Sequence, residues 1–112
     1  MSRQKMYFKW EIPKTVVDVV KSHCADYKRR ERMIKFSTIT GAVLDEYVRL
    51  NSIIDNALED VEVGIRQELL EDVAKGRGYD YSAASPFLAK NTYYPRKRKL
   101  IHDIAEGLSL IP

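Results

Sequence analysis

The sequence predicts an all-α fold, a small bundle of four to five helices with a C-terminal unit like a helix-turn-helix. Apolar residues recur at intervals of three and four, which is the spacing of one helix face. Glycine and proline mostly fall between these periodic segments, where they begin or end a helix. A chain of 112 residues has room for one modest core. We therefore expect a single domain over residues 1–112, with core or dimerisation helices in 1–74 and the helix-turn-helix-like part in 75–112.

The first helix is expected over residues 13–33. Pro13 suits a first helical turn, and apolar side chains follow at near-helical spacing at Val16, Val20, Cys24 and Tyr27. Cys24 is the only cysteine, so it has no disulfide partner within the chain and is expected in the core. Ahead of this helix, residues 1–12 are rich in aromatic side chains, and we expect them to pack on a neighbouring element.

A secondary basic cluster closes this helix, and it consists of Lys28, Arg29, Arg30 and Arg32. Cations stabilise the C-terminal end of a helix through the helix dipole, so the cluster has a structural explanation. Contact with phosphate groups is the functional alternative, and the sequence favours neither.

The longest periodic signal spans residues 43–69. Its apolar positions are three or four residues apart throughout, at Val43, Tyr47, Leu50, Ile54, Leu58, Val61, Ile65 and Leu69. One straight helix of this length, at about 1.5 Å per residue, would outreach a compact chain of this size. We therefore expect two helices, or one helix bent near Asn51-Ser52 or Gly64, and a helix-mediated homodimer is the alternative. The acidic residues of this stretch mostly lie off the stripe and are expected to face solvent.

Two glycines in the segment KGRG, residues 75–78, predict the end of that helix. Ser85 and Pro86 are suited to cap and start a short helix through residues 87–89, and residues 90–91 would form a tight turn. The expected order is helix, glycine turn, short helix, turn and basic helix, which is the plan of a helix-turn-helix.

The last expected helix covers residues 91–110 and is held by an apolar stripe. The stripe consists of Leu100, Ile101, Ile104, Ala105 and Leu108, with Tyr93 and Tyr94 as its extension. Asn91 and Thr92 offer side-chain oxygens for an N-cap, and Pro95 is tolerated only in a first turn. Lys97 is in line with the stripe, so its aliphatic stem is expected to pack there.

The charged end of this helix predicts contact with nucleic acid. Its cations lie in the first turns, although the helix dipole favours them in the last, so helix stability does not account for them. Recognition helices meet bases and phosphates at this end. The candidate DNA-binding residues are Lys90, Asn91, Thr92, Tyr93, Arg96, Lys97, Arg98 and Lys99. A well-solvated surface helix is the alternative interpretation of the same charges.

The candidates are expected to divide between bases and phosphates. Thr92, Arg96 and Lys99 lie opposite the stripe and are placed to reach the major groove, with Arg96 expected to make a bidentate contact to guanine. The residues expected to meet phosphates are Lys90, Lys97 and Arg98, together with a hydroxyl of Tyr93 or Tyr94.

Charge is segregated along the chain, although the net charge is only +3. Residues 1–37 carry ten basic and four acidic side chains, residues 38–74 carry two and nine, and residues 75–112 carry seven and three. The two basic ends could converge on one polyanion, or the acidic and basic parts could pair within or between chains. The sequence does not choose between these arrangements.

Several function classes lack their signatures in this sequence. There is no glycine-rich phosphate loop, nucleophile elbow or metal-ligand cluster, so no enzyme activity, cofactor or metal is expected. No apolar run approaches the roughly 20 residues of a membrane span, and residues 1–9 lack a signal-peptide core. We therefore expect a cytoplasmic protein that does not engage a membrane.

The run NTYYPRKRKLIHDIAEGLSLI, preceded by a long acidic helix and a short linker, resembles the C-terminal end of small phage-encoded regulators of the RinA and ArpU type. The likeness covers about the last third of the chain and rests on Thr92, Tyr93, Tyr94, Arg96, Arg98 and the pattern of Ile101, Ile104, Ala105 and Leu108. Such regulators activate late or lytic genes and carry a DNA-binding end similar to region 4 of bacterial sigma-70 factors.

The resemblance and the charge layout together predict a sequence-specific regulator of transcription that binds double-stranded DNA and is of phage or prophage origin, with RNA polymerase as a further partner. The alternative is a helical protein-binding adaptor, such as a phage assembly factor or a polymerase modulator that never touches DNA. RNA binding is a third option, because four tyrosines could stack on unpaired bases, namely Tyr79, Tyr81, Tyr93 and Tyr94.

Overall fold

The structure is a computed structural model, and it describes residues 12–112. Four α-helices make up most of this part of the chain. They are α2 (Lys14–Phe36), α3 (Gly41–Leu58), α4 (Arg66–Lys75) and α5 (Lys90–Gly107), with the 3-10 turns η1 (Val63–Ile65) and η2 (Tyr79–Tyr81) before and after α4. These residues contain no strand, so the predicted small all-α bundle is confirmed. The prediction for the aromatic segment falls on residues outside the described part, apart from Ile12.

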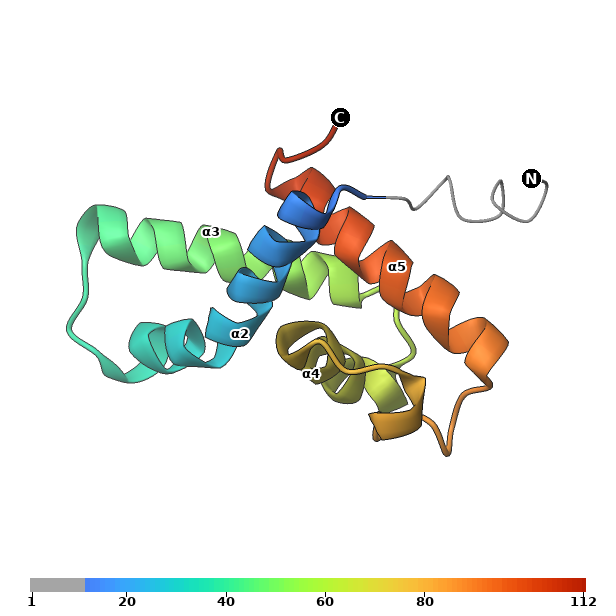
Figure 1. Cartoon of the computed structure of the whole chain (residues 1–112). Coiled ribbons are helices and arrows are strands. Elements are labelled where there is room, and N and C mark those ends of the chain that lie inside the picture. The colour runs from blue at the N-terminus through green and yellow to red at the C-terminus, as the bar shows by residue number, and fades with distance from the viewer. Residues whose placement is uncertain (1–11) are drawn as a thin grey trace.

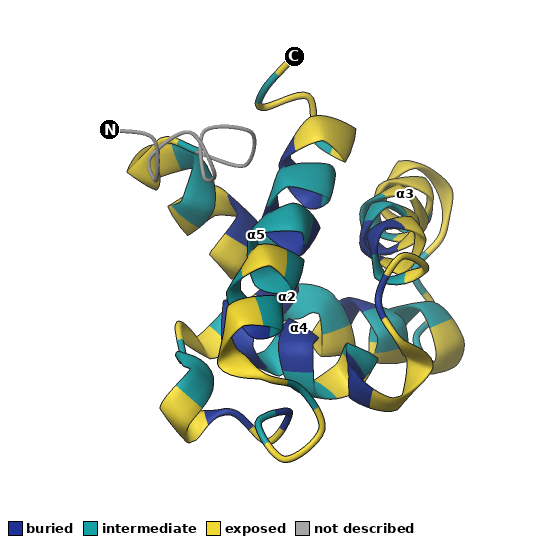
Figure 2. Ribbon diagram, turned by 90° about the vertical axis from the view of Figure 1, so that its right-hand side faces the viewer, coloured by how far each residue is buried: buried dark blue, intermediate teal, exposed yellow. Residues whose placement is uncertain are grey.

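The four helices meet around α2. This helix packs against α3 and α4, and α5 lies across α3 and α2 (Figure 1). Buried positions lie mainly where the helices face one another (Figure 2). The largest apolar side chains of this core are almost fully buried, and they are Val20, Ile54, Leu69, Tyr93, Leu100 and Ile104. Cys24 is buried among them as predicted, and burial raises the pKa of its thiol to about 12.

A buried polar pair joins α2 to α3. Arg30 is only 2% exposed, and its Nε donates to Oδ1 of Asn51 at 2.7 Å. The Arg30 guanidinium also donates to the carbonyl oxygen of His23 at 2.9 Å, and Asn51 donates to the carbonyl oxygen of Tyr27 at 3.2 Å. Beyond this pair, residues 31–50 have no fully buried side chain, and the two helices project together from the bundle (Figure 1).

The apolar stripe of residues 43–69 is divided between two helices, which is one of the two arrangements expected. The break runs from the end of α3 at Leu58 to the start of α4, so it includes Gly64 and leaves Asn51 inside α3. Val61 and Ile65 stay buried while the chain turns. Arg66 donates to the carbonyl oxygens of Val61 and Glu59 at 2.8 Å and 3.1 Å, which satisfies groups left without helical partners.

Gly76 ends α4 in the left-handed conformation, with φ of 68°. Its N–H donates to the carbonyl oxygen of Val73, and the N–H of Arg77 donates to that of Asp72 at 2.9 Å, which is a Schellman arrangement. The glycine end of the helix is therefore confirmed.

The short helix predicted from Ser85 and Pro86 is absent, because residues 83–87 form turns and η2 lies ahead of them. Phe87 is 74% exposed, so a helix there would bury little of its apolar surface. The connector from α4 to α5 covers residues 76–89, which is longer than the three- to four-residue turn of a helix-turn-helix. None of the described helices has a stretch both long and apolar enough to cross a membrane.

Candidate nucleic-acid interface

The C-terminal helix α5 is docked by the stripe that the sequence predicts. Its fully buried residues are Tyr93, Leu100, Ile101, Ile104 and Ala105. Tyr94 and Leu108 are half-buried and pack against the same core. This docking turns the opposite side of α5 toward solvent and toward the break between α3 and α4.

The helix begins earlier than predicted, at Lys90. Ala89 precedes it, and the N–H groups of Thr92 and Tyr93 both donate to the Ala89 carbonyl oxygen, at 3.0 Å and 2.8 Å. The expected side-chain cap by Asn91 or Thr92 is therefore wrong. As a result Pro95 lies inside the helix, where it has no N–H to offer the carbonyl group one turn earlier.

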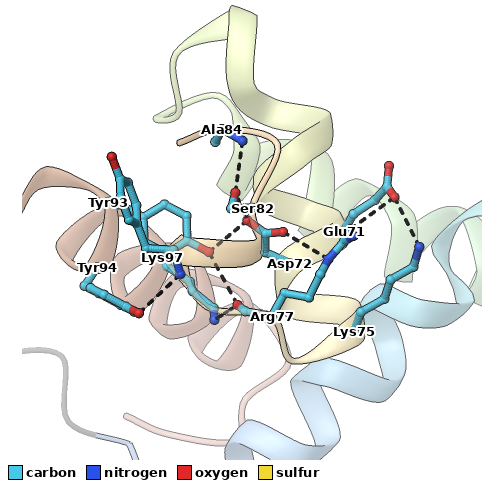
Figure 3. A network of polar contacts seen from close by, with 10 residues as sticks. Glu71, Asp72, Lys75, Arg77, Ser82, Ala84, Tyr93, Tyr94 and Lys97 are labelled. Atoms are coloured by element: carbon cyan, nitrogen blue, oxygen red, sulfur yellow. Dashed lines mark hydrogen bonds and ion pairs between the residues drawn. The ribbon is translucent and has the colours of Figure 1, made fainter. Parts of the chain in front are cut away.

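A buried carboxylate fixes the first half of α5 to the end of α4 (Figure 3). Asp72 is fully buried, and its Oδ2 accepts hydrogen bonds from the hydroxyls of Tyr93, at 2.8 Å, and of Ser82. Its Oδ1 faces Nε of Arg77 at 3.4 Å, an ion-pair distance without hydrogen-bond geometry. The Tyr93 ring also packs edge-on against Tyr79, with centroids 5.3 Å apart.

This network removes Tyr93 from the predicted interface. Its hydroxyl is committed to Asp72, and burial, followed by that carboxylate, raises the pKa of the phenol. No motif in the sequence marks Asp72. The sequence feature that could have indicated its burial is its position, three residues after Leu69 and one before Val73, which puts this carboxylate on the buried side of α4.

Lys97 also points inward, as its position on the stripe predicts. Its ammonium group donates to the carbonyl oxygen of Arg77 and lies 6.0 Å from the centre of the Tyr93 ring. Burial lowers the pKa of this lysine. Its first role is therefore to hold α5 against the connector.

Two of the three residues expected to reach the major groove, Arg96 and Lys99, lie against the protein's own acids. Arg96 makes a bidentate ion pair with Glu62, in the break between α3 and α4, with Nε to Oε1 at 3.0 Å and a terminal nitrogen to Oε2 at 3.0 Å. Lys99 contacts Asp60 at 2.9 Å and Asp103 at 2.7 Å. These bonds lower the pKa of Glu62 and of Asp60. The Arg96 and Lys99 side chains stay 41% and 37% exposed, so the pairs lie at the surface.

The remaining candidates on α5 lie at its start and along one edge. Lys90 and Asn91 are exposed, and Thr92 is half-buried, with its hydroxyl 3.5 Å from Oδ1 of Asn91. The Arg98 guanidinium lies over the Tyr94 ring, 5.9 Å from its centre.

The secondary cluster on α2 is divided by the fold. Lys28 and Arg32 are exposed, whereas Arg30 is buried against Asn51 and cannot meet a phosphate in this arrangement. Arg29 pairs with Asp26 and lies over the Tyr47 ring. The phosphate interpretation therefore loses Arg30, whose role is structural.

Three potential ligand atoms lie within 4.8 Å of one another on α5, from His102, Asp103 and Glu106. The Lys99 ammonium already pairs with Asp103, so this carboxylate belongs to an ion-pair network.

No family model, curated protein or solved structure matches this chain. The likeness to phage regulators therefore remains a prediction from the sequence.

Proposed function

We propose that this protein binds double-stranded DNA in a sequence-specific manner and regulates transcription, with α5 entering the major groove. The observation that carries the proposal is the charge of a firmly docked helix. Residues 81–102 contain no acidic side chain, and five basic ones lie on α5 within them, at Lys90, Arg96, Lys97, Arg98 and Lys99. The Asp72 network and the buried stripe hold this helix in a fixed orientation, which base reading requires.

The ion pairs of Arg96 and Lys99 are compatible with this proposal on energetic grounds. An exposed ion pair contributes about 0–1 kcal/mol, whereas a bidentate contact from arginine to guanine discriminates by about 1–3 kcal/mol. A guanine can therefore replace Glu62 as the partner of Arg96. Lys90 and Arg98 are the proposed phosphate contacts, and Tyr93 and Lys97 position the helix.

The proposal is tested by selecting bound sequences from a random duplex pool and then measuring Arg96→Ala on selected and random DNA. The substitution should weaken binding to the selected sequence by about 1–3 kcal/mol and weaken binding to random DNA much less. Arg49→Ala is the matched control, because Arg49 is an exposed arginine paired with Glu46 on α3. Equal losses on both DNAs for Arg96→Ala would rule out base reading by this residue.

Phage or prophage origin, cytoplasmic location and contact with RNA polymerase are parts of the proposal that derive from the sequence. A homodimer also belongs here, and a two-fold symmetric sequence in the selected pool would support it.

The second candidate function is a protein-binding adaptor, and a specific observation favours it. Val63 and Phe87 are 77% and 74% exposed, and Phe87 borders a groove with Glu62, Gly64, Ile65 and Leu88. Glu62, the ion-pair partner of Arg96, is one of the residues that border this groove. An adaptor predicts negligible affinity for random duplex DNA even at low salt.

RNA binding by tyrosine stacking has little support from the fold. Tyr93 is buried, and Tyr79 and Tyr94 are half-buried and bonded to each other, with the N–H of Tyr79 donating to the Tyr94 hydroxyl at 3.2 Å. Of the four tyrosines, Tyr81 alone is largely exposed, at 81%.

A further inference from the structure

We propose that a cationic surface formed by Lys21 and Lys28 of α2, Lys75 of α4 and Arg98 of α5 binds the sugar-phosphate backbone of the DNA duplex beside the site that α5 reads. We call these four residues the basic ridge. The inference rests on the proposed function, since it names how the same duplex is held.

Lys21 and Lys28 belong to a row of lysines along α2. The row repeats at every seventh position, at Lys14, Lys21, Lys28 and Lys35, and all four side chains are exposed. Seven residues make almost two helical turns, with a drift of about 20° per step, so the four side chains share one face. Lys14 pairs with Asp18 at 3.1 Å.

Lys21 and Lys28 lie on the side of α2 that packs against α4. Lys28 borders a groove of about 280 Å³ between the two helices, and Lys75 borders the same groove. The ammonium group of Lys21 lies 2.9 Å from the position that a Cβ atom at Gly76 would occupy. The Lys21 side chain therefore lies directly against the backbone at the end of α4.

The same end of α4 also meets α5. The ammonium group of Lys97 donates to the carbonyl oxygen of Arg77, the residue after Gly76 (Figure 3). Lys97 is close enough to Lys21 and Arg98 for both charges to lower its pKa, after the larger effect of burial. Cations from α2 and α5 thus converge at the glycine turn.

Two acidic residues of α4 lie beside this surface. Glu71 is shared between Lys75 at 3.4 Å and Arg77 at 3.5 Å, and Asp72 is buried. Within residues 12–112, Lys21 and Lys28 form no ion pair. An anion placed here would relieve the mutual repulsion of the ridge.

The arrangement suits a polymer better than a single anion. Lys21 and Lys28 are seven residues apart, which is about 10 Å along the helix. Side chains this far apart along one helix can each contact a different phosphate of one DNA strand. The ridge also continues directly into α5, so one duplex can contact both.

The test measures binding of the full chain to a random duplex over a salt series, for the wild type and for Lys21→Gln/Lys28→Gln. Each lost phosphate contact should reduce the slope of log K against log salt by about 0.9, so the double substitution should reduce it by nearly two. Binding to a selected sequence should weaken by the same factor, because backbone contacts carry no sequence information. Arg49→Gln, which removes an exposed charge on α3, should leave the slope unchanged.

The outcomes separate this inference from the proposed function. If the wild type binds duplex DNA and the double variant keeps the full slope with an unaltered circular dichroism spectrum, the ridge is refuted while DNA binding stands. If Arg49→Gln reduces the slope as much per charge, the effect is one of net charge and the ridge is again refuted. If the wild type does not bind duplex DNA at low salt, the proposed function itself fails.

Discussion

Two residues that look like surface groups in the sequence are structural in the fold. Asp72 and Arg30 are each at most 2% exposed, and each gathers partners from a second helix or from the connector. A buried polar group is costly when it loses its partners, so such networks hold one arrangement in preference to others. The orientation of α5 depends on Asp72 in this way.

Tyr93→Phe tests that dependence. Removing the hydroxyl leaves the Asp72 carboxylate short of one donor in a buried site, so the free energy of unfolding in urea should fall by about 1–3 kcal/mol. Tyr81→Phe is the matched control, because Tyr81 is 81% exposed, and it should change stability by less than about 0.5 kcal/mol. Equal stability of the two variants would show that Asp72 does not need this bond.

Glu62→Gln tests whether the protein's own acid competes with DNA for Arg96. The substitution weakens the Arg96 ion pair and removes a negative charge near the duplex, so affinity for duplex DNA should rise about two- to fivefold. Glu59→Gln removes the same charge from the same break, but Glu59 makes no ion pair in residues 12–112. A larger gain for Glu59→Gln than for Glu62→Gln would contradict competition at Arg96.

At the scale of elements, the sequence predicts well whatever depends on local periodicity. The stripe of α5, the glycine end of α4 and the start of α2 follow from spacing and from turn residues alone, whereas α2 continues to Phe36, beyond its expected end at Met33. The partners of Arg96 and Arg30 do not, because they lie 34 and 21 positions away and are brought close only by packing. The conformation of the connector was not predicted either. It depends on Ser82, ahead of the expected helix, whose hydroxyl donates to Asp72 and accepts from the N–H of Ala84.

Pro95→Ala probes the interior proline of α5. Proline is about 3 kcal/mol less favourable than alanine inside a helix, and Pro95 is exposed, so the free energy of unfolding should rise by about 1–3 kcal/mol. Pro86→Ala is the control in the connector, where stability should stay the same or fall slightly. Urea unfolding followed by circular dichroism measures both. A loss of stability on Pro95→Ala would mean that the proline favours this helix.

At the scale of the whole molecule, the segregated charges of the sequence pair within the chain. Arg96 and Lys99 from the basic C-terminal third meet Glu62 and Asp60 from the acidic middle. Lys21 and Lys28 of α2, in contrast, form no ion pair within residues 12–112. The proposed basic ridge therefore lies at the edge of α5 and on α2 rather than on the outer face of α5.

Stability should depend on pH through His23, which lies beside Arg30. Burial, and then the charge of Arg30, lower the pKa of His23, and they outweigh the opposing charge of Asp26; the charges of Arg49 and Glu46 have smaller effects of opposite sign. The unfolded chain binds this proton at the ordinary pKa of about 6.5, so stability is present above that pH and falls as the pH is lowered through it.

Urea unfolding at pH 7.5 and pH 5.5 measures this effect, and His23→Gln should remove part of the fall between the two. The carboxyls with lowered pKa, such as that of Glu62, add their own loss only at more acidic pH. An equal fall in the wild type and in His23→Gln would show that His23 does not contribute.

The most direct test of the account is the affinity of the wild-type chain for a random duplex, measured by fluorescence anisotropy from about 50 to 200 mM salt. A docked α5 with the basic ridge beside it predicts binding at low salt. With roughly three to five phosphate contacts, log K should fall against log salt with a slope of about −3 to −5. An absence of binding at 50 mM salt, or an affinity that does not change with salt, would contradict the claim that this surface meets DNA.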